Sequence, residues 1–584
     1  MADTKKTVLD TKNDIIRYTD KLTPPEGYSL SFAVGTTYSL DMNAFGQALI
    51  ALDNSDRVID PYFSLINAIN NLSGKVILFH DAGALKALDK EIYKTVDHFF
   101  ISINKLNGAF HPKIWLMRYK CNADPKTEKF RLLVLSRNMS FDKSLDLIYA
   151  MDGEWDENKD CEAKNKPLCD LLKFLTDKTG LDEPRKTEIE YLEESLKHVV
   201  FKTNGAEMFD DFEFMLSTPD NKQFADSDLF KGPFNELLIM SPFLKEITVG
   251  NLLKNAKKVS IITREDQLKE LIKPLNDNAG KDISVFILNN ENSSEDFKDY
   301  NLHAKLYVTK NKKEQNLYIG SANATYGASN NNVEFLIRLH CRENAITLLR
   351  NDMEKGKLFK KIEDFENCNK EPTDEEKERK KADDLLRELS RLEVEAKADK
   401  NKNGLFDITL SFTITEEFKK DAIGYTIEIM PGSAGKAKKL DSVMVYRDIE
   451  QKNIGFFYSV RIYKTENGTH PKDGMLNIHT VVDEDIWDKR NEEVFNIVFS
   501  YQRRCDYMNG KDKSNKETKT RNNTETDNGE PYPSVPIPDR AYEIMLKHAA
   551  EDNWKDPDLE QCFSSGETSE LFNLFEQALE AMKS

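Results

Sequence analysis

A motif that occurs twice constrains the fold of this chain more than any other feature. His111 and Lys113 in "GAFHPKIWLMRY" form an H-x-K pair at the start of a strand-like run, and His303 and Lys305 in "NLHAKLYVTK" form another. Successive side chains of a strand point to opposite faces, so the His and Lys of each pair are expected on one face. A single pair would indicate an exposed sheet edge, whereas two pairs indicate a duplicated unit.

A second short motif follows each pair, at the end of the next strand-like run. The first copy is "LLVLSRN", with Ser136 and Asn138, and the second is "LYIGSAN", with Ser321 and Asn323. Each half of this region therefore has H-x-K, then a strand, then S-x-N. This order predicts two related repeats whose motifs serve one function.

The surrounding sequence predicts one architecture for both repeats. Short apolar strands such as "KVILFHDA" and "KVSIITR" alternate with segments of helical spacing such as "AFGQALIALDN". This alternation is typical of α/β proteins, so we expect two tandem α/β sandwich repeats that form one catalytic unit. The predicted boundaries are 1–160 for the first repeat, 161–205 for a helical connector, 206–365 for the second repeat, 366–403 for a charged linker helix and 404–584 for a β-rich C-terminal module.

The segment before the C-terminal module has the pattern of a solvated connector helix. Thr373 and Glu376 form a candidate capping box, and Leu385, Leu389 and Leu392 follow at helical spacing. We expect this Leu stripe to dock the helix. Beyond it, "LFDITLSFTIT", "GYTIEIMP", "FFYSVRIY" and "EVFNIVFSYQ" predict strands.

Composition limits the classes of function. The formal net charge of -18 argues against a generally basic nucleic-acid coat but allows a locally basic cleft. The chain has no apolar run of membrane-spanning length and no secretory leader, so we expect a cytoplasmic protein. The 7 Cys include no CxxC pair, which favours reduced thiols over zinc ligands. The polar segment 508–530 predicts a disordered loop.

The two motifs resemble those of the phospholipase D superfamily, whose signature is H-x-K, a later Asp and G-S-x-N. "HAKLYV" with "YIGSANAT" is a close match, and "HPKIWLMRY" with "LLVLSRNMSFDKSLD" is similar to a divergent nuclease-like branch in which S-R-N replaces G-S-x-N. The resemblance covers residues 28–345 but not the C-terminal third. It implies that both repeats meet at one active site across a pseudo-twofold interface.

The chain departs from that signature at the Asp position. The position five after each motif Lys holds Arg118 in the first repeat and Lys310 in the second. The family's Asp is not the nucleophile, so its absence does not predict an inactive enzyme. The two cations favour a polyanionic substrate.

The residue types of the motifs suit phosphodiester chemistry. A neutral imidazole that attacks a phosphodiester forms a phosphohistidine, and a second imidazole protonates the leaving oxygen and later deprotonates water. Charged and polar groups must hold the phosphate oxygens, and two lysines in that role require no metal ion or cofactor. The candidates for holding the oxygens are Lys113, Lys305, Asn138 and Asn323, and for further donation or for holding the turns Ser136 and Ser321.

Each imidazole needs an acceptor that orients its second nitrogen. Glu334 follows the second S-x-N motif at the spacing where the family has such a Glu, and Asp146 is the candidate in the first repeat. Resemblance to the family favours His111 as the nucleophile and His303 as the acid and base, and the symmetry of the motifs leaves the reverse open. Arg137 is a candidate contact for substrate phosphate, with a structural role as the alternative.

Three functions fit these features. The favoured one is a metal-independent nuclease that acts on DNA rather than RNA, and analogy with the nuclease-like branch suggests a role in bacterial anti-phage defence. The second is a phospholipase or phosphatidyl transferase with the same two histidines. The third is a non-catalytic scaffold that binds nucleic acid. We expect no membrane partner, and the C-terminal module is a candidate site for a protein partner or for oligomerisation.

Overall fold

The structure is a computed structural model that describes most of the chain up to residue 495. Of the predicted loop over 508–530 only β26 (Thr524–Glu525) is described, paired with β27 (Pro531–Tyr532), and the rest of the loop lies outside the described residues. The described residues are 17–495, without 55–60, 87–90, 105, 142, 206–207, 290–299, 313, 343–344, 355–357, 364–372, 433–435, 467–471 and 483–485, together with β26 and β27.

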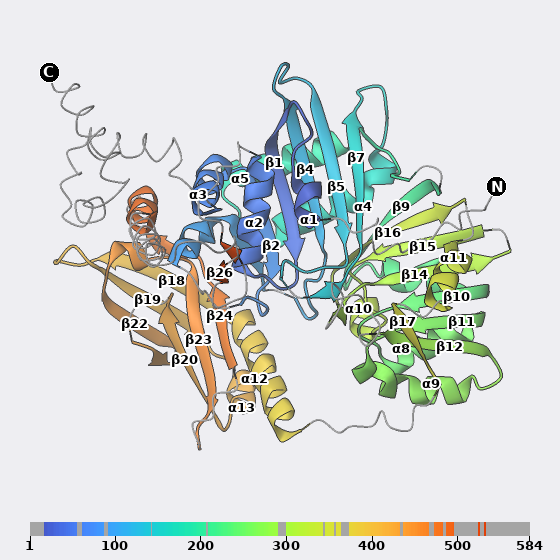
Figure 1. Cartoon of the computed structure of the whole chain (residues 1–584). Coiled ribbons are helices and arrows are strands. Elements are labelled where there is room, and N and C mark those ends of the chain that lie inside the picture. Colours follow the sequence, from blue (N-terminus) through green and yellow to red (C-terminus); the bar gives the residue numbers. More distant parts are fainter. Residues whose placement is uncertain are drawn as a thin grey trace, which may run out of the picture.

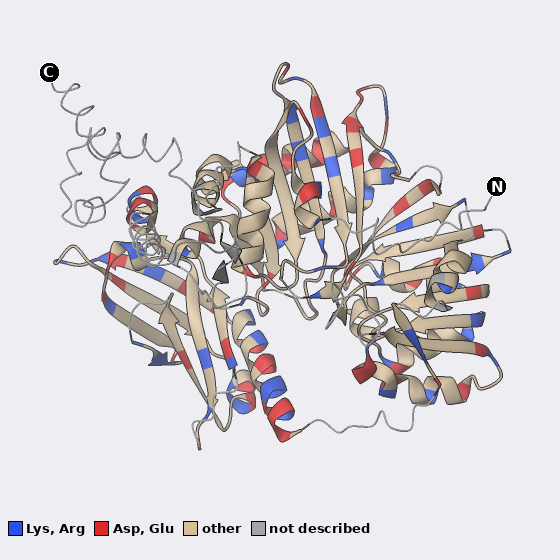
Figure 2. Ribbon diagram, in the orientation of Figure 1, with Lys and Arg blue, Asp and Glu red and all other residues tan. Residues whose placement is uncertain are grey.

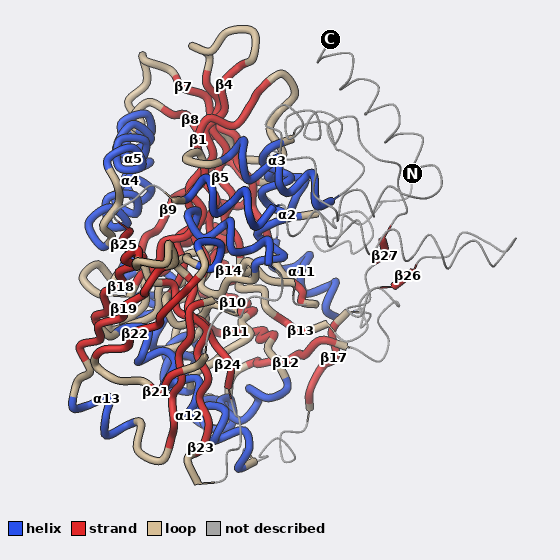
Figure 3. Tube along the Cα trace, turned by 90° about the vertical axis from the view of Figure 1, so that its left-hand side faces the viewer, coloured by secondary structure: helices blue, strands red, loops and turns tan. Residues whose placement is uncertain are grey.

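The first repeat is a 7-stranded sheet in the order β3-β2-β1-β4-β5-β7-β8, with helices on both faces. In Figure 3, α4 and α5 lie on one side of the strands and α2 and α3 on the other. Strands β1, β2 and β3 are parallel, and β4 begins the antiparallel part. The bounds are α1 (Tyr18–Leu22), β1 (Tyr28–Thr37), α2 (Met42–Asp53), α3 (Pro61–Leu72), β2 (Val76–Asp81), β3 (Phe100–Ile103), β4 (Ile114–Cys121), β5 (Glu128–Leu135), β7 (Ile148–Trp155), α4 (Glu162–Lys178), α5 (Glu183–Leu196) and β8 (Val199–Phe201).

The second repeat has an 8-stranded sheet, β17-β12-β11-β10-β14-β15-β16-β9. Its part β12-β11-β10-β14-β15-β16 repeats the order and the strand directions of β3-β2-β1-β4-β5-β7, so the duplication read from the motifs is also present in the topology (Figure 1). The bounds are β9 (Phe209–Ser217), α6 (Gln223–Asp226), α7 (Asp228–Lys231), β10 (Phe234–Met240), α8 (Glu246–Lys254), β11 (Ala256–Ile262), α9 (Ile272–Asp277), β12 (Asp282–Leu288), β14 (Leu306–Asn311), β15 (Glu314–Gly320), α10 (Tyr326–Asn330), β16 (Glu334–Cys341), α11 (Ala345–Glu354) and β17 (Phe359–Ile362).

The two sheets share one hydrophobic core. Val34 and Leu132 of the first sheet lie in the same buried cluster as Val308 and Ile337 of the second. All six residues of β2 are buried, because the central strands of a sheet covered on both faces have no solvent side. A shared core fixes the repeats against each other, and this is what allows one site to form between them.

The linker helix is shorter than predicted. Helix α12 (Asp374–Arg391) begins with the predicted capping box, in which Thr373 and Glu376 bond reciprocally, and Leu385 and Leu389 are buried as expected. Residues from 393 onward form strand β18 (Glu393–Lys400) instead of helix. Its alternating buried Ala and exposed charged residues give a strand pattern that the high charge of the segment hid.

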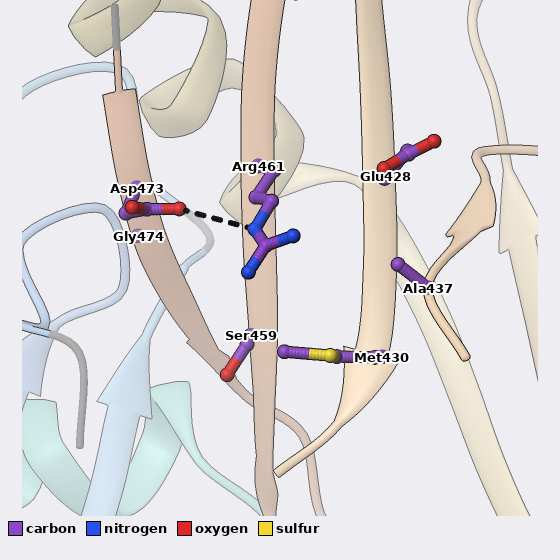
Figure 4. Close-up of a pocket in the computed structure, with 7 residues that line it drawn as sticks. All are labelled: Glu428, Met430, Ala437, Ser459, Arg461, Asp473 and Gly474. Atoms are coloured by element: carbon purple, nitrogen blue, oxygen red, sulfur yellow. Dashed lines mark ion pairs between the residues drawn. The ribbon is translucent and has the colours of Figure 1, made fainter. Parts of the chain in front are cut away.

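The C-terminal module contains two 4-stranded sheets, β22-β19-β18-β25 and β21-β20-β23-β24. The predicted strand "EVFNIVFSYQ" was wrong in its described part, because 493–495 continue a helix that starts at 487. On the second sheet a shallow pocket contains Arg461, which forms an exposed ion pair of 3.7 Å with Asp473 (Figure 4). The bounds are β19 (Phe406–Thr413), α13 (Glu416–Asp421), β20 (Tyr425–Pro431), β21 (Lys438–Lys439), β22 (Val443–Ile449), β23 (Phe457–Lys464), β24 (Lys472–Asn477) and β25 (Thr480–Val482).

The module is docked on the first repeat by buried polar contacts. Arg490 and Asp97, each with a side chain 1% exposed, form an ion pair of 2.7 Å, and Asp97 also accepts a hydrogen bond from the Phe456 amide. The Phe457 ring packs on Phe100 of β3. A buried and fully bonded ion pair holds its two elements in one geometry.

Candidate active site

The H-x-K pairs lie immediately before strands and do not form the first residues of the strands as expected. His111 and Lys113 precede β4, and His303 and Lys305 precede β14. The backbone leaves the sheet here because it bonds to the other repeat. The His111 amide donates to the Val333 carbonyl at 3.0 Å.

The second repeat makes the equivalent contact. The His303 amide donates to the Leu145 carbonyl at 3.0 Å, next to the short pairing of β6 (Ser144–Leu145) with β13 (Asn301–Leu302). Val333 precedes Glu334 and Leu145 precedes Asp146 in the chain. Both contacts therefore bring a His of one repeat to a carboxylate of the other, about a pseudo-twofold axis.

The carboxylates bond to the histidines in this crossed arrangement. His111 Nδ1 lies 2.8 Å from Glu334 Oε2, and His303 Nδ1 lies 3.1 Å from Asp146 Oδ1. Asp146 was predicted as the acceptor in the first repeat, and the structure shows that it serves the histidine of the second. An Nδ1–H that donates to a carboxylate leaves the Nε2 lone pair for chemistry.

The motif serines hold these carboxylates. Ser136 Oγ donates to Asp146 Oδ1 at 3.2 Å and accepts the Leu147 amide at 2.8 Å. Ser321 Oγ donates to Glu334 and accepts the Phe335 amide at 3.0 Å. Each hydroxyl hydrogen is used within the protein, so the serines position the carboxylates and fix the turns.

The two lysines are buried without a carboxylate of their own. Lys113 and Lys305 are each 1% exposed, and their Nζ atoms donate to the carbonyls of His111 at 2.9 Å and His303 at 2.7 Å. Within the described residues no carboxylate oxygen lies within 4.0 Å of either Nζ. Burial and the charge of Lys305 hold the pKa of Lys113 well below its usual value, and burial lowers the pKa of Lys305 to about 8. Two close and incompletely compensated cations favour an anion between them.

The motif asparagines have unused hydrogen-bonding capacity. Asn138 Oδ1 and Asn323 Oδ1 are both buried and lack a hydrogen-bond partner within the described structure. Both side chains follow motif serines in the two repeats. Buried polar atoms are normally bonded, so two equivalent unsatisfied amides indicate a place where a ligand or water binds.

Burial and charge keep both imidazoles neutral near pH 7. Burial lowers the pKa of His111 to about 4, although Glu334 opposes the shift. Burial and Lys305 lower the pKa of His303, with Asp146 opposing. Burial raises the pKa of Asp146, but the hydrogen bond and charge of His303, together with Ser144 and Arg137, outweigh burial and lower it to about 2. The site thus combines neutral imidazoles with ionised carboxylates.

Three basic side chains that the sequence analysis linked to an anionic substrate form ion pairs with carboxylates of the protein instead. Arg137 pairs with Asp146 at 3.3 Å and donates to the Ser140 carbonyl, which is the structural alternative considered for it. At the Asp positions of the signature, Arg118 pairs with Glu188 at 2.7 Å and Lys310 with Glu236 at 3.0 Å. The two cations expected to favour a polyanion are therefore held by acidic side chains.

Sequence reasoning missed several side chains around His111. Asp81, at the end of β2, accepts the Phe110 amide at 2.8 Å and so holds the backbone before His111. Asn332 donates to Glu334 Oε1 at 3.0 Å, and the Tyr38 ring packs edge-on against the His111 ring with 5.3 Å between centroids. Asp81 ends a strand, Tyr38 follows one and Asn332 shortly precedes one. This position at a strand end was the only feature of the sequence that pointed to them. In the described part of the chain no cluster of three or more His, Cys, Asp or Glu is placed to hold a metal ion.

Comparison with protein-family models and with curated proteins gives no match. Among solved structures, the chain is similar to phosphatidylserine synthase from Haemophilus influenzae Rd KW20, with 11% identity and a TM-score of 0.36 over 63% of this chain and 91% of that one. It is also similar to polyphosphate kinase from Porphyromonas gingivalis, with 12% identity and a TM-score of 0.30 over 58% of this chain and 44% of that one.

A third similar structure is a phospholipase D family member, Nuc from Salmonella typhimurium, with 13% identity and a TM-score of 0.20 over 26% of this chain and 100% of that one. That protein is described as a member of the family whose motifs this chain resembles. The geometry of the site, rather than these distant likenesses, carries the function proposed next.

Proposed function

We propose that the protein is a metal-independent phosphodiesterase that cleaves nucleic acid through a phosphohistidine. The observation that carries this proposal is the pair of crossed contacts, His111 with Glu334 and His303 with Asp146. Two imidazoles oriented by carboxylates, each with a buried lysine that bonds to the backbone carbonyl of the same histidine, are the groups that a two-step displacement at phosphorus requires.

His111 is the proposed nucleophile. With its Nδ1–H bonded to Glu334 and its pKa at about 4, the imidazole is neutral at physiological pH and its Nε2 lone pair is available. The bond from Nε2 to phosphorus forms as the bond from phosphorus to the leaving oxygen breaks. The imidazolium form of His303, which is the minor form near pH 7 because its pKa is lowered, gives its Nε2 proton to that oxygen.

His303 is better placed to handle water. Its side chain is 24% exposed, whereas that of His111 is 11% exposed. In the second step neutral His303 takes a proton from water as the water oxygen bonds to phosphorus and the phosphorus–nitrogen bond breaks. His111 is released neutral and His303 regains its proton, so the cycle balances.

The lysines and asparagines stabilise the charge that develops on the equatorial oxygens. Lys113 and Lys305 supply positive charge in a dry site, where it acts more strongly than in water. Asn138 and Asn323 add amide groups whose bonding is unsaturated without a ligand. The amide nitrogens of these residues can donate to phosphate oxygens, whereas their unpartnered Oδ1 atoms can be satisfied only by a donor, such as a water molecule or a hydroxyl group of the substrate.

Exposed aromatic side chains support nucleic acid as the substrate. Phe141 and Tyr326 occupy equivalent places, five residues after Ser136 and Ser321, and are 44% and 53% exposed. Exposed aromatic rings that follow both S-x-N motifs by three residues would suit the stacking of unpaired bases. We favour DNA over RNA. The phospholipid alternative uses the same histidines, and among the described residues no helix is long and apolar enough to cross a membrane.

To test the proposal, the purified protein is incubated with plasmid DNA, single-stranded DNA, RNA or phospholipid, each with excess EDTA, and cleavage of each substrate is measured. We expect EDTA-resistant cleavage of nucleic acid that is lost in both His111→Ala and His303→Ala. Hydrolysis of phospholipid alone would favour the transferase alternative, and binding without cleavage would favour a scaffold. A cytoplasmic role in anti-phage defence, with the C-terminal module binding a partner, is part of the proposal and rests on analogy.

A further inference from the structure

Helix α12, which joins the second repeat to the C-terminal module, packs directly beside the His111 half of the site. A Cβ atom on Gly83 would lie 3.0 Å from Arg387 Cα and 2.9 Å from Arg387 Cγ, so the helix touches the loop after β2 with no space between them. The other face of α12 is anchored by Leu385 and Leu389 in the core of the C-terminal module. The helix is therefore held firmly against the first repeat.

Two arginines of α12 reach the surroundings of His111. Arg387 Nη2 donates to Tyr38 Oη at 3.5 Å, and the Tyr38 ring packs on His111 and lies 5.9 Å from Lys113 Nζ. Arg391 Nη2 donates to the carbonyl of Gly108 at 2.8 Å, three residues before His111. A short path of contacts thus connects the helix to the proposed nucleophile.

The charges of these arginines are only partly neutralised. Arg387 pairs with Asp384 at 3.3 Å, but both side chains are more than a third exposed, so water weakens the pair. For Arg391 no carboxylate lies within 4.0 Å in the described structure, and the buried Asp81 carboxylate interacts with both arginines only at longer range. Figure 2 shows basic and acidic residues alternating along the rest of α12, so the helix as a whole is not a basic patch.

The arginines break the twofold symmetry of the site. Thr37 Oγ1 and Ser241 Oγ make equivalent bonds, to the carbonyls of Ser39 and Phe243 at 2.8 Å in each case. This equivalence places Pro242 of the second repeat at the position of Tyr38. The residue equivalent to Tyr38, which Arg387 contacts, is therefore a proline in the second repeat.

We propose that Arg387 and Arg391 form a subsite for the phosphate next to the scissile one, on the His111 side. The inference rests on the proposed function and extends it, because it makes α12 a third contributor to the active site. A planar guanidinium offers paired donors that match the oxygens of a phosphate. A polynucleotide places such a phosphate one nucleotide away, whereas a diester with a single phosphate does not.

The test compares kcat/KM for a single-stranded oligonucleotide of about ten nucleotides with that for a dinucleotide, which has no flanking phosphate. In Arg391→Ala and Arg387→Ala the ratio of the two values should fall about tenfold, through KM rather than kcat. Arg391→Lys should recover part of the loss, since charge remains without the fork. Arg379→Ala is the matched control, because it removes the same charge from an exposed position of the same helix.

The salt dependence of oligonucleotide affinity gives a second readout. In Arg391→Ala the slope of log affinity against log salt should decrease by about one. Arginine variants that match Arg379→Ala in both readouts, with the wild type still cleaving nucleic acid, would overturn the subsite alone. A wild type that cleaves no nucleic acid would overturn the proposed function and the subsite with it. Unchanged thermal unfolding of each variant shows that the effect is local.

Discussion

His111 Nδ1 lies 2.8 Å from Glu334 Oε2, although the two residues are 223 positions apart and belong to different repeats. The reciprocal contact joins His303 of the second repeat to Asp146 of the first. Neither repeat alone has an oriented imidazole, because each supplies the acceptor for the other. The duplication is therefore needed to assemble the site.

Replacing Glu334 with Gln should lower kcat/KM about 100-fold or more, because His111 loses the acceptor that sets its tautomer. Glu334 raises the pKa of His111, which is about 4, so its removal should also move the acid limb of the pH profile to lower pH. The assay is hydrolysis of bis(p-nitrophenyl) phosphate across pH. Glu213→Gln, which alters an exposed ion pair with Arg338 in the same sheet, should leave the profile unchanged.

Replacing Asp146 with Asn should shift the alkaline limb of the pH profile, which depends on the pKa of His303. With an oligonucleotide substrate, whose leaving oxygen needs a proton, His303 must be protonated to act as the acid. Cleavage of the oligonucleotide, measured across pH, should therefore decline as pH rises through the pKa of His303, which lies below 6.5. Asp146 raises that pKa, so the Asn variant should lose activity at lower pH than the wild type. An alkaline limb that stays in place would remove His303 as the acid.

Replacing Phe141 or Tyr326 with Ala should weaken binding of a single-stranded oligonucleotide by about tenfold, since each stacked base contributes about 1–3 kcal/mol. Fluorescence anisotropy with the inactive His303→Ala protein measures this without cleavage. Trp155→Ala is a suitable control. Trp155 is 47% exposed, but it is the last residue of β7, at the opposite end of the strand from Ile148, which follows Asp146 closely in the sequence. Equal losses in all three would argue against a specific stacking role.

Replacing Lys113 with Met should abolish activity and stabilise the fold. Burial lowers the pKa of Lys113, so the unfolded chain binds the proton more tightly and the charged lysine destabilises the folded state at neutral pH. The free energy of unfolding should rise by about 1 kcal/mol or more at pH 7. This gain in the free energy of unfolding should shrink as pH approaches 10.5, the ordinary pKa of a lysine side chain. Urea unfolding at several pH values measures it, and a loss of stability at pH 7 would contradict it.

The strands and the motif residues could be predicted from the sequence. The residue that each motif histidine contacts could not. "KVILFHDA" and "KVSIITR" became β2 and β11, because an apolar run bounded by polar residues specifies a buried strand locally. The crossed pairing depends on how two sheets pack through a shared core, which no local pattern encodes. Asp146 and Glu334 could be proposed as acceptors, but not which histidine each would serve.

The contacts of α12 with the residues around His111 were missed for a similar reason. Arg387 and Arg391 lie in a segment whose mixed charge is typical of a solvated helix, and only the tertiary contacts with Tyr38 and Gly108 distinguish them from its other cations. The same charge hid β18, whose small buried Ala residues give a weak strand signal. Local patterns fail where charged side chains serve tertiary contacts.

Mapping the covalent intermediate tests the central claim most directly. In His303→Ala, a nucleotide ester of p-nitrophenol should still react, because its leaving group needs no proton, and the adduct should persist, because no base activates water. Denaturation at alkaline pH and peptide mass spectrometry should place the phosphoryl group on His111. An adduct on another residue, or sustained turnover of this ester by His303→Ala without an adduct, would contradict a shared site in which His111 attacks and His303 completes the reaction.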